Sequence, residues 1–159
     1  GEGNAAGYGG RPGTTNTFEN SLWYVNAMGH AATVGIGRFL RQTLVGGGYE
    51  LVNGTTFAPN PDFWCAVLFH RLVGQAMLNA TVIQTAPAMG GDHVRVYAAC
   101  AAAGADGDDL TVVAVNFDST VGSTDMQVAV GAASAQLWQL TPGDATAPQC
   151  RSSTVALLS

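Results

Sequence analysis

The chain has 159 residues and a formal net charge of −5, and its six basic residues are all Arg. Nucleic acids and highly sulfated polyanions are bound by clustered basic residues, so this composition argues against both as ligands. No apolar run reaches the roughly 18 to 20 residues that a membrane-spanning helix requires. The length allows one ordinary domain or parts of two.

The first predicted element is a helix that starts near residue 18. Apolar residues recur there at intervals of four, three and three, as on one side of an α-helix. These residues are Phe18, Leu22, Val25 and Met28. Asn16 or Thr17 is suited to cap the start of the helix, and Gly29 stands where such a helix would end.

A buried strand over residues 34–45 is predicted next, because apolar residues dominate this stretch. Arg41 and Gln42 interrupt it near its C-terminal end. A second helix is predicted from Asn60, which is suited to the cap position and is followed by a Pro in the first turn. We expect this helix to close at Gly74.

The sequence changes character at about residue 75. Short apolar stretches are separated there by turns rich in Gly, Asp and Ser, a pattern typical of an antiparallel β-sandwich. The five predicted strands are Met77–Thr85, His93–Ala99, Leu110–Phe117, Met126–Val130 and Gln136–Leu140.

This order of elements predicts an α/β plus β fold. Residues 1–75 would form the last strands and helices of a (β/α)8 barrel, and residues 76–159 part of an antiparallel β-sandwich domain. In such barrels the chemistry lies at the C-terminal ends of the strands. Glu2, together with Arg41 and Gln42 at the end of the next strand, would then share one rim. The Gly-rich surroundings of Glu2 alone fit a flexible linker as well as a ligand-facing turn.

Residue types that bind metals do not occur here at metal-ligand spacing. The cysteines match no zinc pattern, the histidines form no pair, and a short acidic run is typical of a turn. These residues are Cys65, Cys100 and Cys150, then His30, His70 and His93, and finally Asp106, Asp108 and Asp109. We therefore expect neither a metal nor a cofactor.

Many short stretches, in the same order over residues 1 to about 117, resemble the C-terminal part of the heparanases and their relatives in glycoside hydrolase family 79. No single stretch is specific, but their shared order is. They include Gly1-Glu2, Tyr8-Gly9-Gly10, Asn16-Thr17-Phe18, Gly35-Ile36, Arg41-Gln42, Tyr49-Glu50-Leu51-Val52, Pro61-Asp62-Phe63-Trp64 and Val94-Arg95-Val96-Tyr97.

The resemblance implies a role for several residues. Glu2 matches the catalytic nucleophile, and Gly9 and Gly10 match glycines whose backbone approaches the sugar carboxylate. Gln42 and Tyr49 match polar groups of the same subsite. The family's general acid/base lies upstream of the first residue, so we expect the chain to be a piece of a longer protein, incomplete at both ends. From the residues alone, Arg41 could hold Glu2 ionised or could pair with another rim residue.

The resemblance thus implies a longer protein that is a retaining β-glucuronidase or endo-β-glucuronidase. Its partner would be a glucuronate-containing oligo- or polysaccharide. The few basic residues of this chain favour a glycan of low sulfation and argue against nucleic acid. We expect it in the secretory pathway, outside the cell or in a lysosome-like compartment, with membrane or matrix association open and the oligomeric state undetermined. Two glycosylation sequons, at Asn53 and Asn79, are weak support for that route. The alternative is a non-catalytic carbohydrate-binding or interaction module from a truncated glycosidase gene.

Overall fold

The computed structural model describes residues 2–83, 93–102, 109–117, 127–128, 134–143 and 155–158. These parts of the chain contain the helices α1 (Phe18–Thr33) and α2 (Pro61–Leu72). They also contain the strands β1 (Val73–Leu78), β2 (Val94–Ala101), β3 (Leu110–Asn116), β4 (Gln139–Pro142) and β5 (Val155–Leu158).

Helix α1 begins where the sequence predicts, with Thr17 at the N-cap in an extended conformation. The prediction that it ends at Gly29 is wrong, because the helix continues to Thr33. Gly29 is a contact point inside the helix: an added Cβ would lie 2.4 Å from the ring of Tyr97 on β2. Gly29 therefore allows close packing of the helix against the sheet and does not end the helix.

The predicted buried strand over residues 34–45 is also wrong. The segment is irregular and mostly exposed, and the residues with regular pairing are few. Leu40 forms a parallel bridge with Glu2, and the Gly3 N–H donates to the Leu40 carbonyl at 2.9 Å. A strand needs neighbouring strands that pair with its backbone N–H and C=O groups. Within the described part of the chain, this segment forms only isolated bridges, at Leu40 and at Val45.

Helix α2 confirms the predicted start, since Asn60 is the N-cap and Pro61 the first helical residue. The Asn60 side chain makes no capping bond; its Nδ2 donates instead to the Glu50 carbonyl at 2.7 Å. The helix ends at Leu72, two residues before the expected Gly74, and Val73 is already the first residue of β1.

Strands β1, β2 and β3 form an antiparallel sheet in that order. The predictions for β2 and β3 are confirmed to within two residues, whereas β1 begins four residues before the expected Met77 and ends at Leu78. Strand β4 lies two to three residues after its predicted bounds and pairs with β5, which was not predicted. The strand predicted at Met126–Val130 lies outside the described residues except for 127–128, which have no regular structure.

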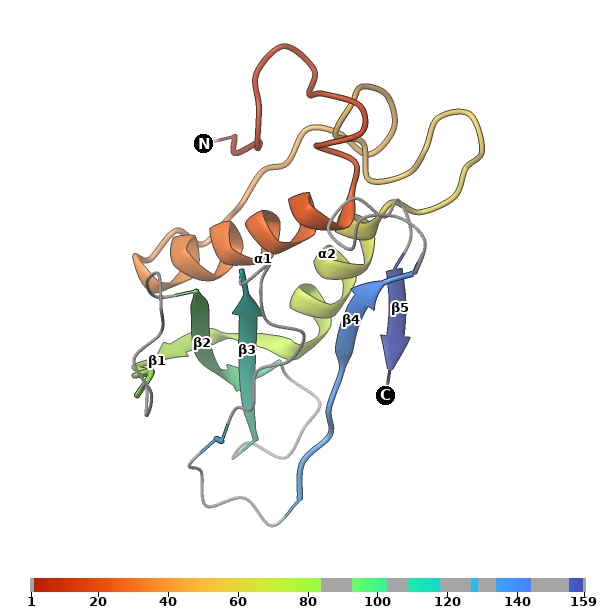
Figure 1. Cartoon of the computed structure of the whole chain (residues 1–159). Helices are drawn as coiled ribbons and strands as arrows, with labels where there is room; N and C mark the ends of the chain where they lie inside the picture. Colours follow the sequence, from red (N-terminus) through yellow and green to blue (C-terminus); the bar gives the residue numbers. More distant parts are fainter. Residues whose placement is uncertain are drawn as a thin grey trace.

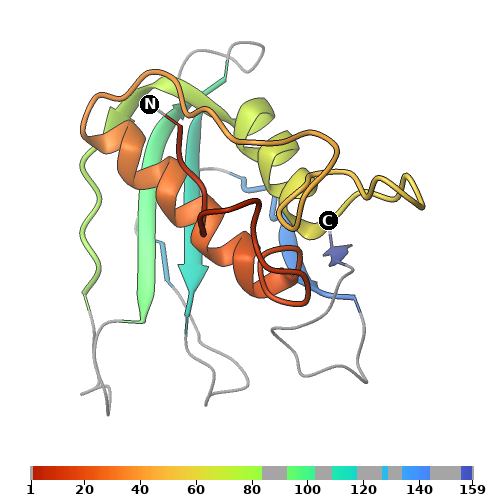
Figure 2. The same ribbon diagram turned by 90° about the horizontal axis from the view of Figure 1, so that it is seen from above.

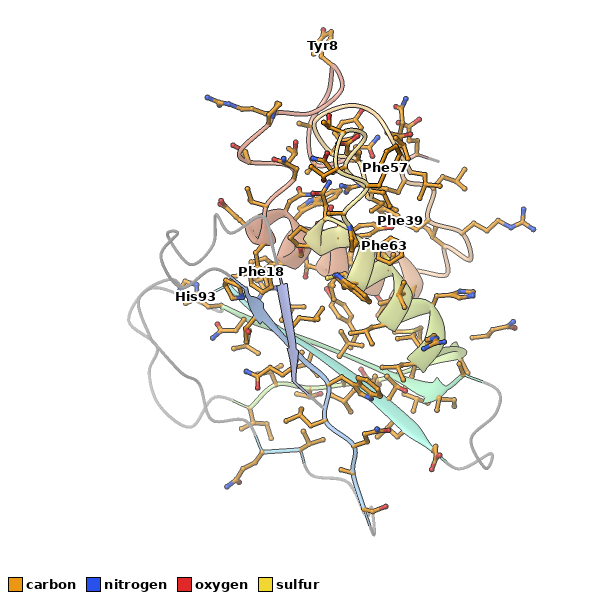
Figure 3. The ribbon with its side chains drawn as sticks, turned by 90° about the vertical axis from the view of Figure 1, so that its right-hand side faces the viewer. Tyr8, Phe18, Phe39, Phe57, Phe63 and His93 are labelled. Carbon is orange, nitrogen blue, oxygen red and sulfur yellow. The ribbon has the colours of Figure 1, made fainter. Side chains whose placement is uncertain are left out.

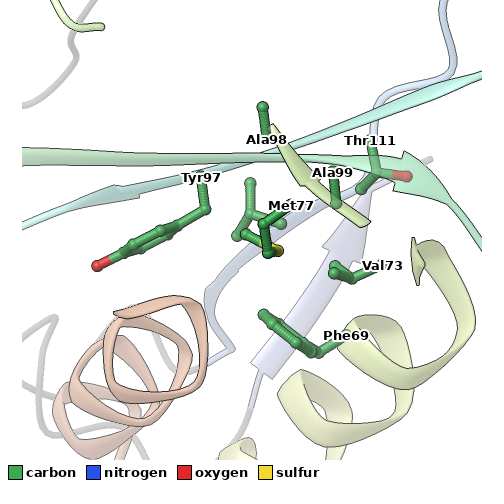
Figure 4. Close-up of a pocket in the computed structure, with 8 residues that line it drawn as sticks. Phe69, Val73, Met77, Tyr97, Ala98, Ala99 and Thr111 are labelled. Atoms are coloured by element: carbon green, nitrogen blue, oxygen red, sulfur yellow. The ribbon is translucent and has the colours of Figure 1, made fainter. Parts of the chain in front are cut away.

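The two helices cover one face of the three-stranded sheet (Figures 1 and 2). The Tyr97 hydroxyl donates to Asn26 Oδ1 of α1 at 2.7 Å, and Thr111 Oγ1 donates to the carbonyl of Leu72 at 2.6 Å. Between α2 and the sheet, Phe69, Val73 and Met77 pack in an apolar junction shown in Figure 4. These contacts pack both helices directly against the sheet.

A small core lies between the helices. Tyr24, Met28 and Cys65 are buried together, and Phe39 and Leu140 are among the partly buried residues that pack on them. Burial raises the pKa of Cys65 to about 12, and the nearby Asp62 carboxylate raises it as well. The described residues thus form an antiparallel sheet with two helices, an arrangement compatible with part of an α/β protein. The barrel and the sandwich remain predictions.

Candidate functional site

Two irregular segments, residues 2–17 and 34–60, lie together on the side of the helices opposite the three-stranded sheet (Figure 1). Glu2 belongs to the first of them, and its side chain is exposed. Asn4 Nδ2 donates to Glu2 Oε1 at 2.6 Å. The parallel bridge to Leu40 places the backbone of Glu2 beside the residue that precedes Arg41.

Gly9 and Gly10 line the contact between the two segments. The Gly48 N–H donates to the Gly9 carbonyl at 2.5 Å, and the Thr15 hydroxyl donates to the Gly48 carbonyl. Gly10 has a φ of 84°, and a Cβ there would lie 2.5 Å from the ring of Tyr49. Only glycine combines that backbone conformation with so close an approach.

Tyr8 precedes these glycines and is the outermost labelled side chain of the loop, pointing away from the rest of the molecule (Figure 3). The Gly10 N–H donates to the Gly7 carbonyl at 3.1 Å, which closes a turn around Tyr8 and Gly9. This turn places the backbone of Gly9 beside Gly48 of the second irregular segment.

Tyr49 and Gln42 form the polar part of the contact. Tyr49 is only 5% exposed, and its hydroxyl donates to Gln42 Oε1 at 3.4 Å. We call Gly9, Gly10, Arg41, Gln42 and Tyr49 the rim cluster. The structure therefore brings five of the six predicted site residues together, whereas the contact given for Glu2 on this segment is the backbone bridge to Leu40, the residue before Arg41.

Arg41 has a buried partner. Its Nη2 donates to Asp62 Oδ2 and, at 3.1 Å, to the carbonyl of Tyr49. The sequence left two roles open for Arg41, pairing with Glu2 or with another residue. Its observed ion pair is with Asp62. Burial raises the pKa of Asp62, and the nearby Arg41 charge and the hydrogen bonds from Ser21 and Asn20 offset part of this effect.

Asp62 is a residue that sequence reasoning missed, because the sequence places it only in the first turn of a helix and in one of the stretches that carry the family resemblance. The available signal was a carboxylate directly after Pro61 in a helix that otherwise carries mostly apolar residues. Its partners Asn20 and Ser21 lie 42 and 41 positions away in the sequence, so no local pattern connects them.

Glu50, an acidic residue of the second segment, bonds to the backbone of its own loop. Glu50 accepts bonds from the N–H groups of Gly46 and Gly54, at 2.6 and 3.0 Å. A cavity of about 330 Å³ lies elsewhere, between the end of α1 and the sheet, lined by residues such as Thr33 and Tyr97.

Among the described residues, no three His, Cys, Asp or Glu side chains gather as a metal site. No helix in the described part of the chain is long and apolar enough to cross a membrane.

No family model matches the chain. Over 118 residues it is 37% identical to the baicalin-beta-D-glucuronidase of Scutellaria baicalensis, covering 74% of the chain and 21% of that relative. It is 43% identical over 98 residues to heparanase-like protein 1 of Arabidopsis thaliana, covering 62% and 17%. Identity to the heparanase of Bos taurus is 42% over 83 residues, covering 52% and 15%. The chain is related to the heparanases.

This heparanase relationship confirms the resemblance predicted from the sequence. The names of the relatives denote a β-glucuronidase and heparanases, so the relationship is to glucuronide-cleaving glycoside hydrolases. The chain spans about a fifth or less of the length of these relatives.

Proposed function

We propose that this chain is the nucleophile-bearing part of a retaining β-glucuronidase or endo-β-glucuronidase, with Glu2 as the nucleophile. The observation that carries the proposal is the parallel bridge between Glu2 and Leu40. Neighbouring parallel strands of a (β/α)8 barrel carry catalytic groups at the same rim. The bridge supports such a pairing between the Glu2 segment and the segment that holds the rim cluster.

The chemistry follows from this arrangement. The ionised Glu2 carboxylate attacks C1 of the glucuronosyl unit, while a carboxylic acid upstream of this chain protonates the departing glycosidic oxygen. A covalent glycosyl–enzyme ester forms and the C1–O bond to the leaving group breaks. The second carboxyl group then removes a proton from water, which attacks C1 and releases Glu2.

The rim cluster would bind the glucuronosyl ring. Tyr49 and Gln42 offer a hydroxyl and an amide to the ring oxygens, and backbone at Gly9 and Gly10 approaches the sugar carboxylate closely because neither residue has a side chain. The Gly10 N–H is bonded to Gly7, so a ligand must share or replace that bond.

The substrate we propose is a glucuronate-bearing glycan of low sulfation. Sulfate groups are recognised by several Arg or Lys residues gathered at one place. This chain has no Lys and only six Arg in 159 residues, and one of these, Arg41, is paired with Asp62. The proposed partners are therefore weakly sulfated proteoglycan or plant-type glycans. We also propose a secretory route for the protein, for which the two sequons at Asn53 and Asn79 are weak support.

The test uses the full-length protein and an aryl β-glucuronide. Glu2→Gln is expected to lower kcat by several orders of magnitude while the thermal unfolding temperature changes little, because the side chain is exposed and nearly isosteric. In a second variant, Glu2→Ala, azide should restore turnover as a glycosyl azide, since the shortened side chain leaves room for a small anion in place of the missing nucleophile. Glu19→Gln, which neutralises an exposed carboxylate in the first turn of α1, is the matched control.

Activity of Glu2→Gln within a few-fold of the parent would reject Glu2 as the nucleophile. Binding of a glucuronate-containing oligosaccharide by the full-length protein without turnover would instead favour the carbohydrate-binding module. The 159-residue chain alone is expected not to hydrolyse the aryl glucuronide, because the second carboxyl group of the mechanism is expected upstream.

A further inference from the structure

Arg41, one member of the rim cluster, forms a buried ion pair with Asp62. The side chains of Arg41 and Asp62 are each only 3% exposed. The same Arg41 nitrogen that donates to Asp62 also donates to the Tyr49 carbonyl at 3.1 Å. Arg41 therefore binds the backbone of one rim residue and immediately precedes another, Gln42, in the chain.

Three aromatic rings enclose the guanidinium group. Arg41 Cζ lies 4.6 Å from the ring centroid of Tyr24, 5.7 Å from that of Tyr49 and 5.9 Å from that of Trp23. These distances are within the range of favourable cation–π contacts. The group is thus held from several sides by α1 and by the rim itself, and it does not present its charge to solvent where a sugar would bind.

Asp62 is fixed by two side chains of α1. Asn20 Nδ2 donates to its Oδ2 at 2.6 Å, and Ser21 Oγ donates to its Oδ1 at 3.1 Å. Asp62 itself lies in the first turn of α2. One carboxylate therefore ties both helices to the irregular segment 34–60, and it holds Arg41 from rigid elements, as precise positioning requires.

We propose that Asp62 and Arg41 are positioning residues that set the relative placement of Gln42 and Tyr49. The inference rests on the proposed function, in which Gln42 and Tyr49 bind the glucuronosyl ring. It assigns Arg41 to the support of the subsite, not to contact with the sugar. The link is direct: Arg41 anchors the Tyr49 backbone, and the Tyr49 hydroxyl reaches Gln42 at 3.4 Å.

The experiment measures KM and kcat separately for the full-length protein on an aryl β-glucuronide. Asp62→Asn keeps the shape but removes the charge that holds Arg41, and we expect KM to rise about 10-fold and kcat/KM to fall about 100-fold, as for small misplacements in other sites. Arg41→Lys keeps the charge but not the planar fork, so the same changes are expected to a smaller degree. It also serves as the test if Asp62→Asn fails to fold.

Two further variants separate positioning from stability. Arg41→Met combined with Asp62→Asn removes both charges and keeps an amide oxygen as acceptor beside Asn20 and Ser21, which should bring the unfolding temperature back toward the parent value while KM stays high. Thr111→Val, on the sheet, should lower the unfolding temperature with an unchanged KM, because KM does not depend on the folded fraction. The proposal is overturned if KM of Asp62→Asn, or of Arg41→Lys, stays within twofold of the parent.

The outcome for Glu2→Gln distinguishes the two proposals. If Glu2→Gln is inactive while the Asp62 and Arg41 variants keep a normal KM, only the positioning role is wrong. If Glu2→Gln retains activity, the proposed function itself is wrong.

Discussion

Replacing Gly29 with Ala sets two effects of opposite sign against each other. In the interior of a helix, Ala is more favourable than Gly by about 0.8–1.0 kcal/mol. Gly29 lies within α1, however, where an added Cβ would be 2.4 Å from Tyr97 Cδ2 and 2.6 Å from Cε2 and Cγ. Ordinary contacts of this kind begin at 3.4 Å, so the ring or the helix must move by about 1 Å.

The ring cannot move freely, because the Tyr97 hydroxyl is bonded to Asn26 of the same helix at 2.7 Å. Overpacking of this kind costs about 1–3 kcal/mol, and a disturbed hydrogen bond adds about 1 kcal/mol. We therefore expect Gly29→Ala to lower the free energy of unfolding by about 1–3 kcal/mol in spite of its better helix propensity. With an m-value of about 2 kcal/mol/M, the urea midpoint should fall by roughly 0.5–1.5 M.

The assay is urea unfolding followed by circular dichroism, and its sharpest form is a double-mutant cycle. In a Tyr97→Ala background the obstructing ring is gone, so Gly29→Ala should stabilise the protein by up to about 1 kcal/mol. Gly37→Ala is the control, because an added Cβ there meets open space. If Gly29→Ala stabilises the protein equally with and without Tyr97, the packing argument is refuted.

Three further predictions concern the sheet and the core. Gly74→Ala should destabilise the protein by at least about 1 kcal/mol, since a Cβ would lie 2.5 Å from the immobile Cys100 carbonyl oxygen; an unchanged melting temperature would contradict this. Thr111→Val should cost up to about 1 kcal/mol by removing one of the two donors to the Leu72 carbonyl, which also accepts from the Ala102 N–H at 3.0 Å, whereas Thr111→Ser should retain most of the stability in the same melting experiment. The Cys65 thiol has its pKa raised from 9.0 to about 12, so the unfolded state loses its proton first and stability falls as the pH rises from 9 towards 12. At pH 10 the loss should be about 1.4 kcal/mol, and a Cys65→Ala variant that shows the same pH slope would disprove it.

The starts of both helices were predictable because their signals are local. Thr17 and Asn60 stand at cap positions, and Pro61 suits only a first turn. The end of α1 was not predictable, because Gly29 looks like a stop signal until the ring of Tyr97 lies against it. That contact joins residues 68 positions apart, and the sequence around Gly29 contains no sign that Tyr97 packs against it.

The segment 34–45 shows the same limit for strands. Its apolar residues predict burial, yet Val34, Ile36 and Leu40 are each about half exposed or more, because burial depends on which neighbours pair with the segment. Strand β5 was missed for a related reason: its ladder with β4 depends on pairing across at least a dozen residues, with no short turn to signal a hairpin.

Most of the candidate site came from a resemblance to known proteins, and the structure shows how its members meet. The turn at Gly9 and Gly10 and the loop at Tyr49 contact each other, which neither segment predicts alone. Asp62 could not be found this way, because its importance lies in partners from other elements: Asn20 and Arg41 reach it from positions far away in the chain.

The continuity of α2 with β1 has a mechanical consequence. Leu72 ends the helix and Val73 begins the strand, so no hinge separates them. The twelve residues of α2 form a rod of about 18 Å, with the three-stranded sheet at one end and the carboxylate that grips Arg41 at the other. A tilt of the sheet would therefore be carried along this helix to the ion pair between Asp62 and Arg41.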